Sequence, residues 1–386
     1  MRGWKTVPLR GVAKLERDIV EASEIKSGTL YVGLENIQSG GDFLNVRQVE
    51  SGELASSKFA FTPKHLLYGK LRPYLAKIAR PDFEGICSTD ILPVLPGQNL
   101  NRDYLSHFLR QPAMVDLANS QATGANLPRL SPRALGEIAI PLPPLLDQRR
   151  IADVLDQAEA LQAKRRAALA QLDTLTQSIF LDMFGDPIKN PHGFPVHPMI
   201  ELIDPQRPIS YGILMPGPDQ VEGVKYVRVV DMKNGGIELS GIRTTTAAMS
   251  NSFRRSLLKP ADLLMSIRGH VGRFAVVPPE LDGANITQDT ARLAIVGASS
   301  VFVRECLRTE GFQRWMAKHT KGVAVRGINL GDVKLMPIIL PPRPAQDKFA
   351  RQANAVEKLK AAHHASHAEL DALFASLQHR AFRGEL

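Results

Sequence analysis

The sequence predicts an α+β fold in which two tandem mixed α/β domains are separated by two long helices that pair as an antiparallel coiled coil. Three observations lead to this prediction. The stretch from Leu142 to Phe184 matches the stretch from Leu340 to Phe382 without a gap, at an offset of 198 (340 − 142). Both stretches have the apolar periodicity of one long helix. Each follows a segment of similar size in which short apolar runs alternate with turn residues.

Length and composition limit the class of protein. The chain has 386 residues, of which 44% are hydrophobic, so it can bury the cores of two or three domains. It has no run of 18 apolar residues and no apolar segment directly after its start, so we expect neither a membrane span nor a signal peptide. The two cysteines, Cys87 and Cys306, suit buried thiols in a reducing, cytoplasmic environment.

The charge balance favours a polyanionic partner. Lysine and arginine exceed aspartate and glutamate by nine (48 − 39), and the sequence pI is about 9.6. A basic balance of this size most often goes with nucleic-acid binding. Charge alone leaves open a soluble basic protein without such a partner.

The repeat continues into the two domains, where its offset drifts. Tyr31 to Leu34 falls on Tyr226 to Val229 at an offset of 195, and Gly124 falls on Gly322 at 198. Between them, Leu71-Arg72 falls on Ile267-Arg268 and Lys77 on Arg273, at 196. The drift indicates small loop insertions in a tandem duplication, not a solenoid. The predicted boundaries are 1–142 for the first domain, 143–184 for the first helix, 185–196 for a linker, 197–340 for the second domain and 341–386 for the second helix.

Short elements are predicted in each copy from local patterns. Runs of β-branched and aromatic residues predict strands at 29–32 and 91–95 in the first copy, and at 225–230 and 274–277 in the second. Glycine-containing steps at 40–41, 234–236 and 282–283 predict turns. Residues 102–110 and 301–317 have helical spacing. We expect the sheets to be mostly antiparallel.

The two long helices carry the clearest pattern. Each follows a pair of prolines, at 143–144 and at 341–342, as is common at helix starts. An apolar spacing of three and four residues then continues for about four heptads, which favours coiled-coil pairing. The residues assigned to helix pairing are Ile151, Leu161, Arg165, Leu172, Ile179, Phe349, Leu359, His363, Leu370 and Leu377.

Antiparallel pairing would bring Arg165 near His363 as a polar layer that fixes the register. For that layer, packing of the helices on different partners is an equally supported alternative. A helix from Leu145 to Met183 would be about 58 Å long at about 1.5 Å per residue. Such helices could hold two domains well over one turn of B-DNA apart.

The motifs of DNA-modifying enzymes are absent from the sequence. The string nearest to a base-gripping Asn-Pro-Pro-aromatic motif is NPHGF at 190–194, which fits a turn better. No glycine-rich cofactor loop and no phosphate loop is present. The spacing of Asp219, Asp231 and Lys233 leaves one alternative, a self-contained DNA nuclease that uses magnesium, although so short a pattern is common by chance. His363, His364 and His367 lack a further ligand, and we interpret them as helix surface, not as a metal site.

Several motifs together resemble the specificity subunit of type I restriction-modification enzymes. They are PLPPLLDQRRIA at 141–152, MFGDP at 183–187, AFRGEL at 381–386 and KLRPYLAK at 70–77. The resemblance covers essentially the whole chain, in the order of the family. The second domain departs from the pattern, because Arg268-Gly269-His270 replaces Arg72-Pro73-Tyr74.

The resemblance implies a function and a set of partners. Two target-recognition domains would each read one half of a bipartite asymmetric sequence in double-stranded DNA, and the two conserved spacer helices would set the gap. Two methyltransferase (modification) subunits would dock on the helices and use S-adenosylmethionine. Restriction/translocase subunits would add ATP- and Mg-dependent translocation and cleavage. The chain itself would hold no cofactor and catalyse nothing.

Candidate DNA contacts follow from side-chain chemistry. Arginine can bind guanine edges, and asparagine or glutamine adenine, whereas cations of any kind contact phosphates. Basic residues gather in two segments of each domain, and a solvated surface charge is the alternative for each of them. The candidates are Lys70, Arg72, Tyr74, Lys77, Asn126 and Arg129 in the first domain, and Arg268, His270, Arg273, Lys321 and Arg326 in the second. Arg254 and Arg255 are additional candidates for phosphate contacts.

Overall fold

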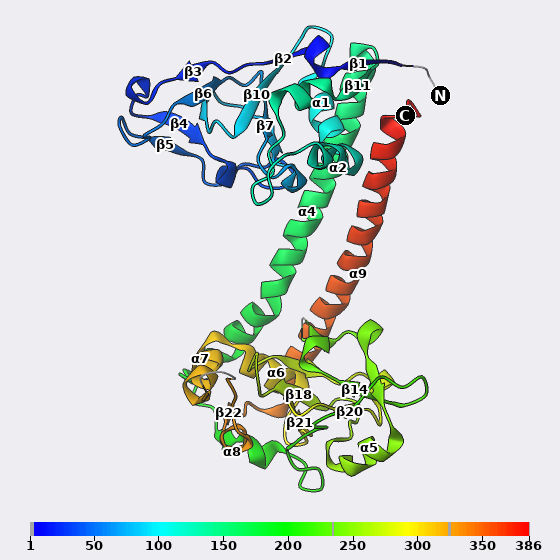
Figure 1. Cartoon of the computed structure of the whole chain (residues 1–386). Helices are drawn as coiled ribbons and strands as arrows, with labels where there is room; N and C mark the ends of the chain where they lie inside the picture. Colours follow the sequence, from blue (N-terminus) through cyan, green and yellow to red (C-terminus); the bar gives the residue numbers. More distant parts are fainter. Residues whose placement is uncertain (1–3, 234, 323–325, 386) are drawn as a thin grey trace. The chain divides into compact units, whose positions relative to one another are not determined.

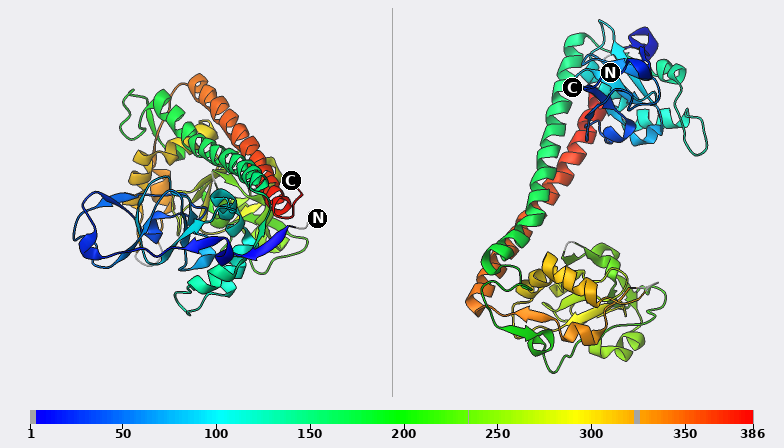
Figure 2. Two further views of the ribbon diagram at one scale, coloured as in Figure 1. Left: turned by 90° about the horizontal axis from the view of Figure 1, so that it is seen from above. Right: turned by 90° about the vertical axis from the view of Figure 1, so that its left-hand side faces the viewer.

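A computed structural model describes residues 4–233, 235–322 and 326–385. The chain divides into two compact units. Unit 1 consists of residues 1–166 and 365–386, and unit 2 of residues 167–364. The two long helices, α4 (Leu145–Phe184) and α9 (Arg343–Ala381), contribute residues to both units, and Figures 1 and 2 show each of them as a continuous ribbon. This composition agrees with the predicted α+β class.

Unit 1 is built on two larger sheets and one strand pair (Figure 1). The first sheet has the order β3-β6-β9-β4-β5, formed by Ile19–Val20, Lys58–Phe61, Gly85–Cys87, Thr29–Val32 and Arg47–Val49. The second has the order β2-β10-β7-β8, formed by Ala13–Leu15, Ile91–Pro96, Leu66–Gly69 and Ile78–Ala79. The pair β1-β11, formed by Lys5–Pro8 and Ala139–Leu142, closes the domain just before α4.

The helices of unit 1 contribute residues to its hydrophobic core. They are α1 (Arg102–Leu109), α2 (Pro112–Ser120) and α3 (Pro132–Glu137). The side chain of Asn101 caps α1 by accepting a bond from the amide of Tyr104 (2.8 Å). The ring of Tyr104 is fully buried and lies 5.2 Å from the ring of Phe382, which follows α9. The end of α9 therefore completes the core of unit 1.

Unit 2 repeats this plan. Its larger sheets have the orders β13-β21-β18-β19, formed by Ser210–Tyr211, Thr290–Leu293, Leu263–Ser266 and Phe274–Val276, and β17-β14-β20, formed by Arg243–Thr245, Val224–Val227 and Asn285–Ile286. The strand pairs are β12-β22, formed by Val196–Pro198 and Pro337–Ile339, and β15-β16, formed by Met232–Lys233 and Gly236–Ile237. The helices are α5 (Ala247–Ser252), α6 (Ser300–Arg308), α7 (Glu310–His319) and α8 (Leu330–Lys334).

The repeat found in the sequence is also a structural repeat. In both copies one strand pair is parallel, β4 with β9 and β14 with β20, among ladders that are otherwise antiparallel within the described residues. Strands β12 and β22 occupy the place before α9 that β1 and β11 occupy before α4. The predicted strand at 29–32 matches β4, and the strand predicted at 225–230 ends at Val227 because a 3-10 turn follows at Val229–Asp231.

One predicted helix is wrong. Residues 301–317 were expected to form a single helix, but α6 ends at Arg308 and α7 begins at Glu310. Thr309 separates them, and its hydroxyl group accepts a bond from the amide of Phe312 (3.4 Å) as the cap of α7. The apolar spacing continues through the break because both helices bury one face in the same core.

A glutamine near the start of each long helix fixes that helix to its domain. Gln148 of α4 is fully buried and accepts a bond from the amide of Asn101 (2.8 Å). Its equivalent at an offset of 198, Gln346 of α9, accepts a bond from the amide of Ser299 (3.0 Å). The amide groups of the two side chains donate to the carbonyl oxygens of Pro143 and of its equivalent, proline 341, both at 2.8 Å. The repeated glutamine thus satisfies backbone groups where α1 and α6 begin.

The two long helices are joined by equivalent contacts inside each unit. In unit 1, Gln162 of α4 donates to the carboxylate of Asp371 of α9 (2.8 Å). In unit 2, Lys360 of α9 lies 3.0 Å from the carboxylate of Asp173 of α4. The two contacts occupy equivalent positions of the repeat, since 162 + 198 = 360 and 371 − 198 = 173. The helices are therefore in contact in both units and run antiparallel there.

The residues predicted to pair the helices take different positions. Ile151 and Leu172 of α4 and Phe349 of α9 are buried, whereas Leu161 and its equivalent Leu359 are 54% and 47% exposed. The neighbours of these leucines, Gln162 and Lys360, take the buried positions. Of the others, Arg165, Ile179, His363, Leu370 and Leu377 are intermediate in exposure. The proximity of Arg165 and His363 stays a prediction, since the first belongs to unit 1 and the second to unit 2.

Two smaller predictions concern the whole chain. Cys87 and Cys306 are both buried free thiols, as expected, and burial raises the pKa of Cys87 to about 12. Among the described residues, no helix is long and apolar enough to cross a membrane.

Candidate nucleic-acid interface

In unit 1 the two segments predicted to contact DNA lie side by side. The amide of Arg72 donates to the carbonyl oxygen of Pro128 (2.7 Å), and the amide of Leu130 donates to that of Lys70 (2.9 Å). Within the second segment, Thr123 and Arg129 exchange two backbone bonds, of 3.0 and 2.8 Å. The segment 70–77 that follows β7 and the loop 121–130 that precedes α3 therefore form one surface. We call this pair of segments the loop pair of unit 1.

Unit 2 builds the same arrangement. The amide of Gly269 donates to the carbonyl oxygen of Arg326 (2.9 Å), and the amide of Ile328 donates to that of Ile267 (2.9 Å). Lys321 and Gly327 exchange two backbone bonds, of 2.8 and 2.9 Å. Residues 267–273 and 319–328 form the loop pair of unit 2, although residues 323–325 of the predicted contact segment lie outside the described residues. Two sequence segments about 50 residues apart are thus joined in the same way in both copies.

The hydrogen bonds correct the alignment of the two copies by one residue. The amides of Arg72 and Gly269 make equivalent bonds, so Gly269 occupies the place of Arg72, and Arg268 that of Leu71. Lys77 and Arg273 remain equivalent, because their carbonyl oxygens both accept bonds from the last residues of β7 and β18. The second copy is therefore one residue shorter between these points, and the alignment of Arg72 with Arg268 was wrong.

Backbone conformation supports the corrected alignment. Arg72 and Gly269 both have a left-handed conformation, with φ values of +53° and +71°. Ala76 and Gly272, at the other end of the same segment, also have positive φ values, of +46° and +88°. Such values are rare for residues other than glycine, so the turn is imposed by the surrounding structure and not by local preference.

The candidate residues of unit 1 are not equally available. Arg72, Tyr74, Asn126 and Arg129 are exposed. Lys77 is not free, because its ammonium group donates to the carbonyl oxygen of Leu34 (2.6 Å). The carboxylate of Asp90 lies 3.3 Å from the guanidinium group of Arg129 and 3.8 Å from the ammonium group of Lys70. Sequence reasoning missed Asp90, which links the two segments of this loop pair.

The cationic candidates of unit 2 are less often paired with a carboxylate than those of unit 1. Arg268, His270, Arg273, Lys321 and Arg326 are all exposed, and none of them has an ion-pair partner within the described residues. Asp289 holds the position of Asp90, since its carbonyl oxygen accepts the equivalent backbone bond from Ile267 (2.8 Å).

The loop pair of unit 2 borders a hollow of about 440 Å³. One side of the hollow is formed by residues 269–271 and by Arg326, and the other by the face of α7 that carries Gln313 and Met316. Gln313 is a second residue that sequence reasoning missed; its amide group donates to the carbonyl oxygen of Leu307 (2.9 Å). No sequence pattern marks Gln313, because a single glutamine on a helix face has no distinctive spacing.

The carboxylates of the nuclease alternative are engaged elsewhere. The guanidinium group of Arg228 holds both oxygens of Asp231, at 2.7 and 3.0 Å. Asp219 accepts bonds from the amide and hydroxyl groups of Thr244, and these bonds lower the pKa of its carboxyl group. Lys233 is paired with Glu238. Each side chain of the proposed trio therefore has its own structural partner.

A dense ionic cluster lies elsewhere in unit 1. His107, Asp156 and Glu159 have ligand-type atoms within 4.8 Å of one another. Their charges are already balanced, since Arg80 lies 2.8 Å from Asp156 and Arg110 lies 2.6 Å from Glu159. The cluster joins the domain of unit 1 to α4, and a metal ion would have to displace two guanidinium groups. The predicted surface histidines lie on α9, where His367 is 3.2 Å from Asp371 and His364 is exposed.

Comparisons with known proteins agree with this architecture. Residues 1–171 match the family model described as the type I restriction modification DNA specificity domain. The chain is 25% identical to the EcoBI specificity subunit of a type I restriction enzyme from Escherichia coli, over 99% of this chain and 86% of that protein. It is 22% identical to the EcoKI specificity subunit from Escherichia coli strain K12, over 100% of this chain and 89% of that protein.

Solved structures give the same fold. A chain in the structure of a type I restriction-modification system matches with a TM-score of 0.65 and 21% identity, covering 100% of this chain and 99% of its own length. The S subunit of a type I system from M. genitalium matches with a TM-score of 0.57 and 13% identity, over 98% of this chain and 96% of its own. The family model over residues 1–171, the relatives that match nearly the whole chain and the shared fold agree, and along its length the chain is similar to type I restriction-modification specificity subunits.

Proposed function

We propose that this specificity subunit reads a bipartite asymmetric sequence in double-stranded DNA, one half-site with each domain. A single observation carries the proposal: the two predicted contact segments of each domain are joined into a loop pair by the same backbone bonds in both copies. The scaffold is repeated, while the exposed side chains on it differ. A repeated scaffold with different side chains is what two related readers of different half-sites require.

The two loop pairs offer different chemistry to DNA. In unit 1, Arg129 and Asn126 carry the donor groups that suit guanine and adenine edges, and Tyr74 adds an exposed ring. In unit 2, the exposed side chains of Arg268, Arg273 and Arg326 favour guanine edges or phosphates. Lys70 and Lys321 suit phosphate contacts, whereas Lys77 supports the loop through Leu34. His270 and Arg72 extend the two surfaces.

We further propose that the chain is non-catalytic and recruits its enzymatic partners through α4 and α9. Exposed leucines occur at equivalent positions of the two helices: Leu161 with Leu359, and Leu175 with Leu373, each pair at an offset of 198. Two equivalent apolar positions favour two copies of one partner, as expected for two modification subunits that use S-adenosylmethionine. Restriction/translocase subunits with ATP and magnesium would complete the assembly, in the cytoplasm.

The paired helices would then serve as the spacer between half-sites. The equivalent contacts Gln162–Asp371 and Asp173–Lys360 support a fixed register of α4 on α9. On this proposal the domain boundaries are those expected from the sequence, with recognition domains at 1–142 and 197–340 and spacer helices at 143–184 and 341–386.

A domain exchange tests the division of labour. Residues 1–142 would be replaced by those of another type I specificity subunit, and the host methylome would be sequenced with the matching modification subunit present. We expect one half-site to change and the other to stay, because each loop pair lies within one unit. A change in both half-sites, or in neither, would contradict the proposal. Re-introducing residues 1–142 of this chain serves as the control.

A further inference from the structure

Unit 2 has a second cationic surface, apart from its loop pair. A hollow of about 460 Å³ is lined by five cationic side chains, Arg207, Arg254, Arg255, Lys259 and Arg292, against one carboxylate, Asp282. We call it the basic hollow. Arg254, Arg255 and Lys259 are exposed, and within the described residues none of the three has an ion-pair partner. So strong an excess of one charge around a concave surface attracts anions.

The floor of the basic hollow holds a buried cation that lacks a carboxylate partner. Arg292 is 1% exposed, and among the residues that the structure describes its guanidinium group donates only to the carbonyl oxygens of Pro208 and Arg255, both at 2.8 Å. Its Nε atom is buried and has no hydrogen-bond partner in the described part of the chain. The nearby carboxylate of Asp262 is already held by Arg207, at 2.8 Å. A buried cation without a counter-charge is unfavourable, and an anion in the hollow would offset that cost.

The rim of the basic hollow is held rigidly. Arg254 and Arg255 lie on a 3-10 turn, Arg254–Ser256, whose Ser256 hydroxyl group donates to the side-chain oxygen of Asn285 (2.6 Å). Asn285 is fully buried and also binds Ser250. The turn is attached through its backbone and through Ser256, so the two arginine side chains remain free to bind a ligand. A cationic rim that is already ordered loses little entropy on binding.

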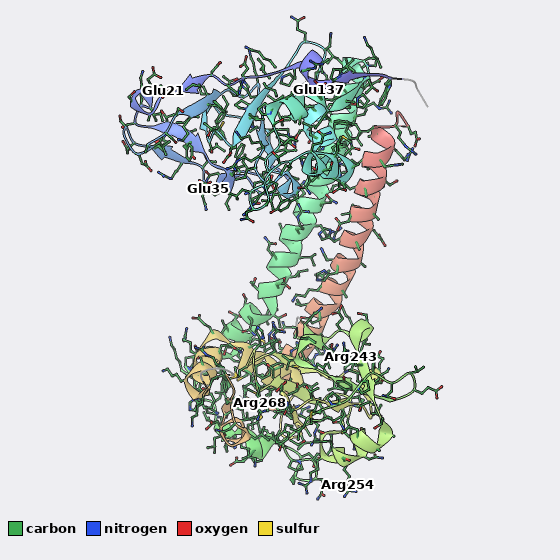
Figure 3. The ribbon with its side chains drawn as sticks, viewed as in Figure 1. Glu21, Glu35, Glu137, Arg243, Arg254 and Arg268 are labelled. Carbon is green, nitrogen blue, oxygen red and sulfur yellow. The ribbon has the colours of Figure 1, made fainter. Side chains whose placement is uncertain are left out.

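The basic hollow and the loop pair lie at opposite ends of strand β18. Asp262 precedes the strand beside the hollow, and Arg268 follows it in the loop pair. The six residue-to-residue steps from Asp262 to Arg268 span roughly 20 Å at about 3.3 Å per step. Figure 3 labels Arg254 and Arg268 on different parts of unit 2. At the corresponding end of β7 in unit 1, the ion pair His65–Glu16 (2.9 Å) takes the place of Arg207–Asp262.

We propose that the basic hollow binds a phosphate of the DNA backbone, about six base pairs from the bases contacted by the loop pair of unit 2, given about 3.4 Å per base pair. The inference rests on the proposed DNA-reading function and adds to it a contact that is independent of sequence. It also makes the two domains unequal, because unit 2 would contribute more of the salt-dependent affinity. Guanidinium groups that converge on one hollow suit the tetrahedral oxygens of a phosphodiester.

Arginine substitutions on the rim test the proposal. We would compare the full chain with the double variant Arg254→Gln/Arg255→Gln and with the control Arg243→Gln, which removes an exposed arginine of β17 from another part of the same unit (Figure 3). The fold should persist, since the turn is attached through its backbone and Ser256. Duplex binding would be measured by anisotropy at several salt concentrations, and ethylation interference would locate the contacted phosphates.

The number of lost phosphate contacts sets the expected size of the effect on DNA binding. Loss of this one phosphate contact should weaken binding by about eightfold at ~0.1 M salt and should make the salt slope shallower by about 0.9, while the control behaves as the wild type. Ethylation of one phosphate about six base pairs from the half-site should block the wild type and leave the double variant unaffected. The methylated sequence should not change.

Three other results would overturn the inference or its premise. If the double variant binds like the control, the basic hollow does not contact DNA. If millimolar inorganic phosphate stabilises the wild type but not the double variant, and duplex binding is equal, the hollow is a small-anion site. If the wild-type chain with its modification subunit binds no duplex at low salt, the proposed function itself fails.

Discussion

Single residues decide how firmly each domain is attached to its helix. Gln148 and Gln346 occur at equivalent positions, and each accepts a bond from the amide at the start of a helix and donates to the carbonyl oxygen of a preceding proline. The sequence repeat marked these glutamines, but their role depends on amides almost 50 residues away. Asp90 gave no such signal, because only the fold brings it to Lys70 and Arg129.

The first residue-level prediction concerns Gln148. Its replacement, Gln148→Ala, leaves the amide of Asn101 and the carbonyl oxygens of Asn99 and Pro143 without their partner in a buried place. We expect a loss of about 1–3 kcal/mol in the stability of unit 1. Hydrogen–deuterium exchange over residues 99–105 and urea unfolding would measure it. The exposed Gln157→Ala, on the same helix, is the control and should change little; equal effects of the two would contradict the assignment.

The second concerns Asp156 and pH. Burial raises the pKa of its carboxyl group, but bonds from His107 and Arg80 outweigh burial and hold the pKa well below its usual value. A carboxyl group whose pKa is lower in the folded state stabilises that state above its unfolded pKa of about 3.9, and the benefit is lost as the pH falls below it.

The wild type should therefore be more stable than Asp156→Asn at pH 6, and the difference should shrink below about pH 4. Urea midpoints of both proteins between pH 6 and pH 3 would measure this. Asp153→Asn, at an exposed position of the same helix, should show no such convergence. If the stability difference between the wild type and Asp156→Asn stayed constant with pH, the bonds from His107 and Arg80 would not owe their strength to the charge of Asp156.

Elements show where sequence patterns succeed and where they fail. The length of α4 and α9 and the strand at 29–32 follow from periodicity, which depends only on which face is buried. The break at Thr309 was missed because α6 and α7 bury a common face. The stripe through Leu161 was displaced by one residue because two of the four positions that repeat every seven residues on the buried face, Leu155, Gln162, Leu169 and Thr176, are polar. Apolar periodicity therefore selected the neighbouring leucines, which are exposed.

The backbone conformation at Gly269 tests the role of the loop pair of unit 2. Gly269 has a left-handed backbone, and a Cβ added there would meet no atom within 4 Å. The equivalent position in unit 1 is occupied by Arg72 with a similar conformation. Gly269→Val should strain the turn by about 1–2 kcal/mol, whereas Gly269→Asn should be tolerated, since asparagine enters this region easily.

We expect Gly269→Val to weaken recognition of the half-site read by unit 2 and to leave the other half-site unchanged. Modification rates on substrates altered in one half-site would measure this effect. Gly269→Asn is the matched control at the same position. Equal loss in both variants would mean that the side chain, and not the backbone conformation, interferes with DNA.

At the scale of the whole molecule, the repeat was predictable and its local register was not. The offset of 198 identified two copies and two helices, since long identical spacings cannot arise from local preference. The single-residue deletion between Gly69 and Lys77 was invisible, because an arginine occurs near both expected positions. Hydrogen bonds to a distant loop were needed to place Gly269 on Arg72.

The spacer proposal leads to a prediction for the whole chain. Seven residues inserted at equivalent points of α4 and α9 would lengthen each helix by about 10.5 Å and preserve the heptad. We expect the gap between half-sites to grow by about three base pairs, with both half-sites unchanged. Methylome sequencing reads the gap directly. Insertion into α4 alone should impair assembly, and an unchanged gap in the double insertion would disprove the spacer role.

Unit 1 contains segments from both ends of the chain, and this determines the order in which the two units can fold. Its core includes Phe382, which packs on Tyr104 and Phe108, so residues at both ends of the chain belong to one unit. A ribosome adding about 5–20 residues per second needs roughly 10 to 40 s to make the intervening 200 residues. Unit 2 is contiguous and can fold first. The domain that is synthesised first is thus completed last, and its exposed core must be protected until translation of α9 ends.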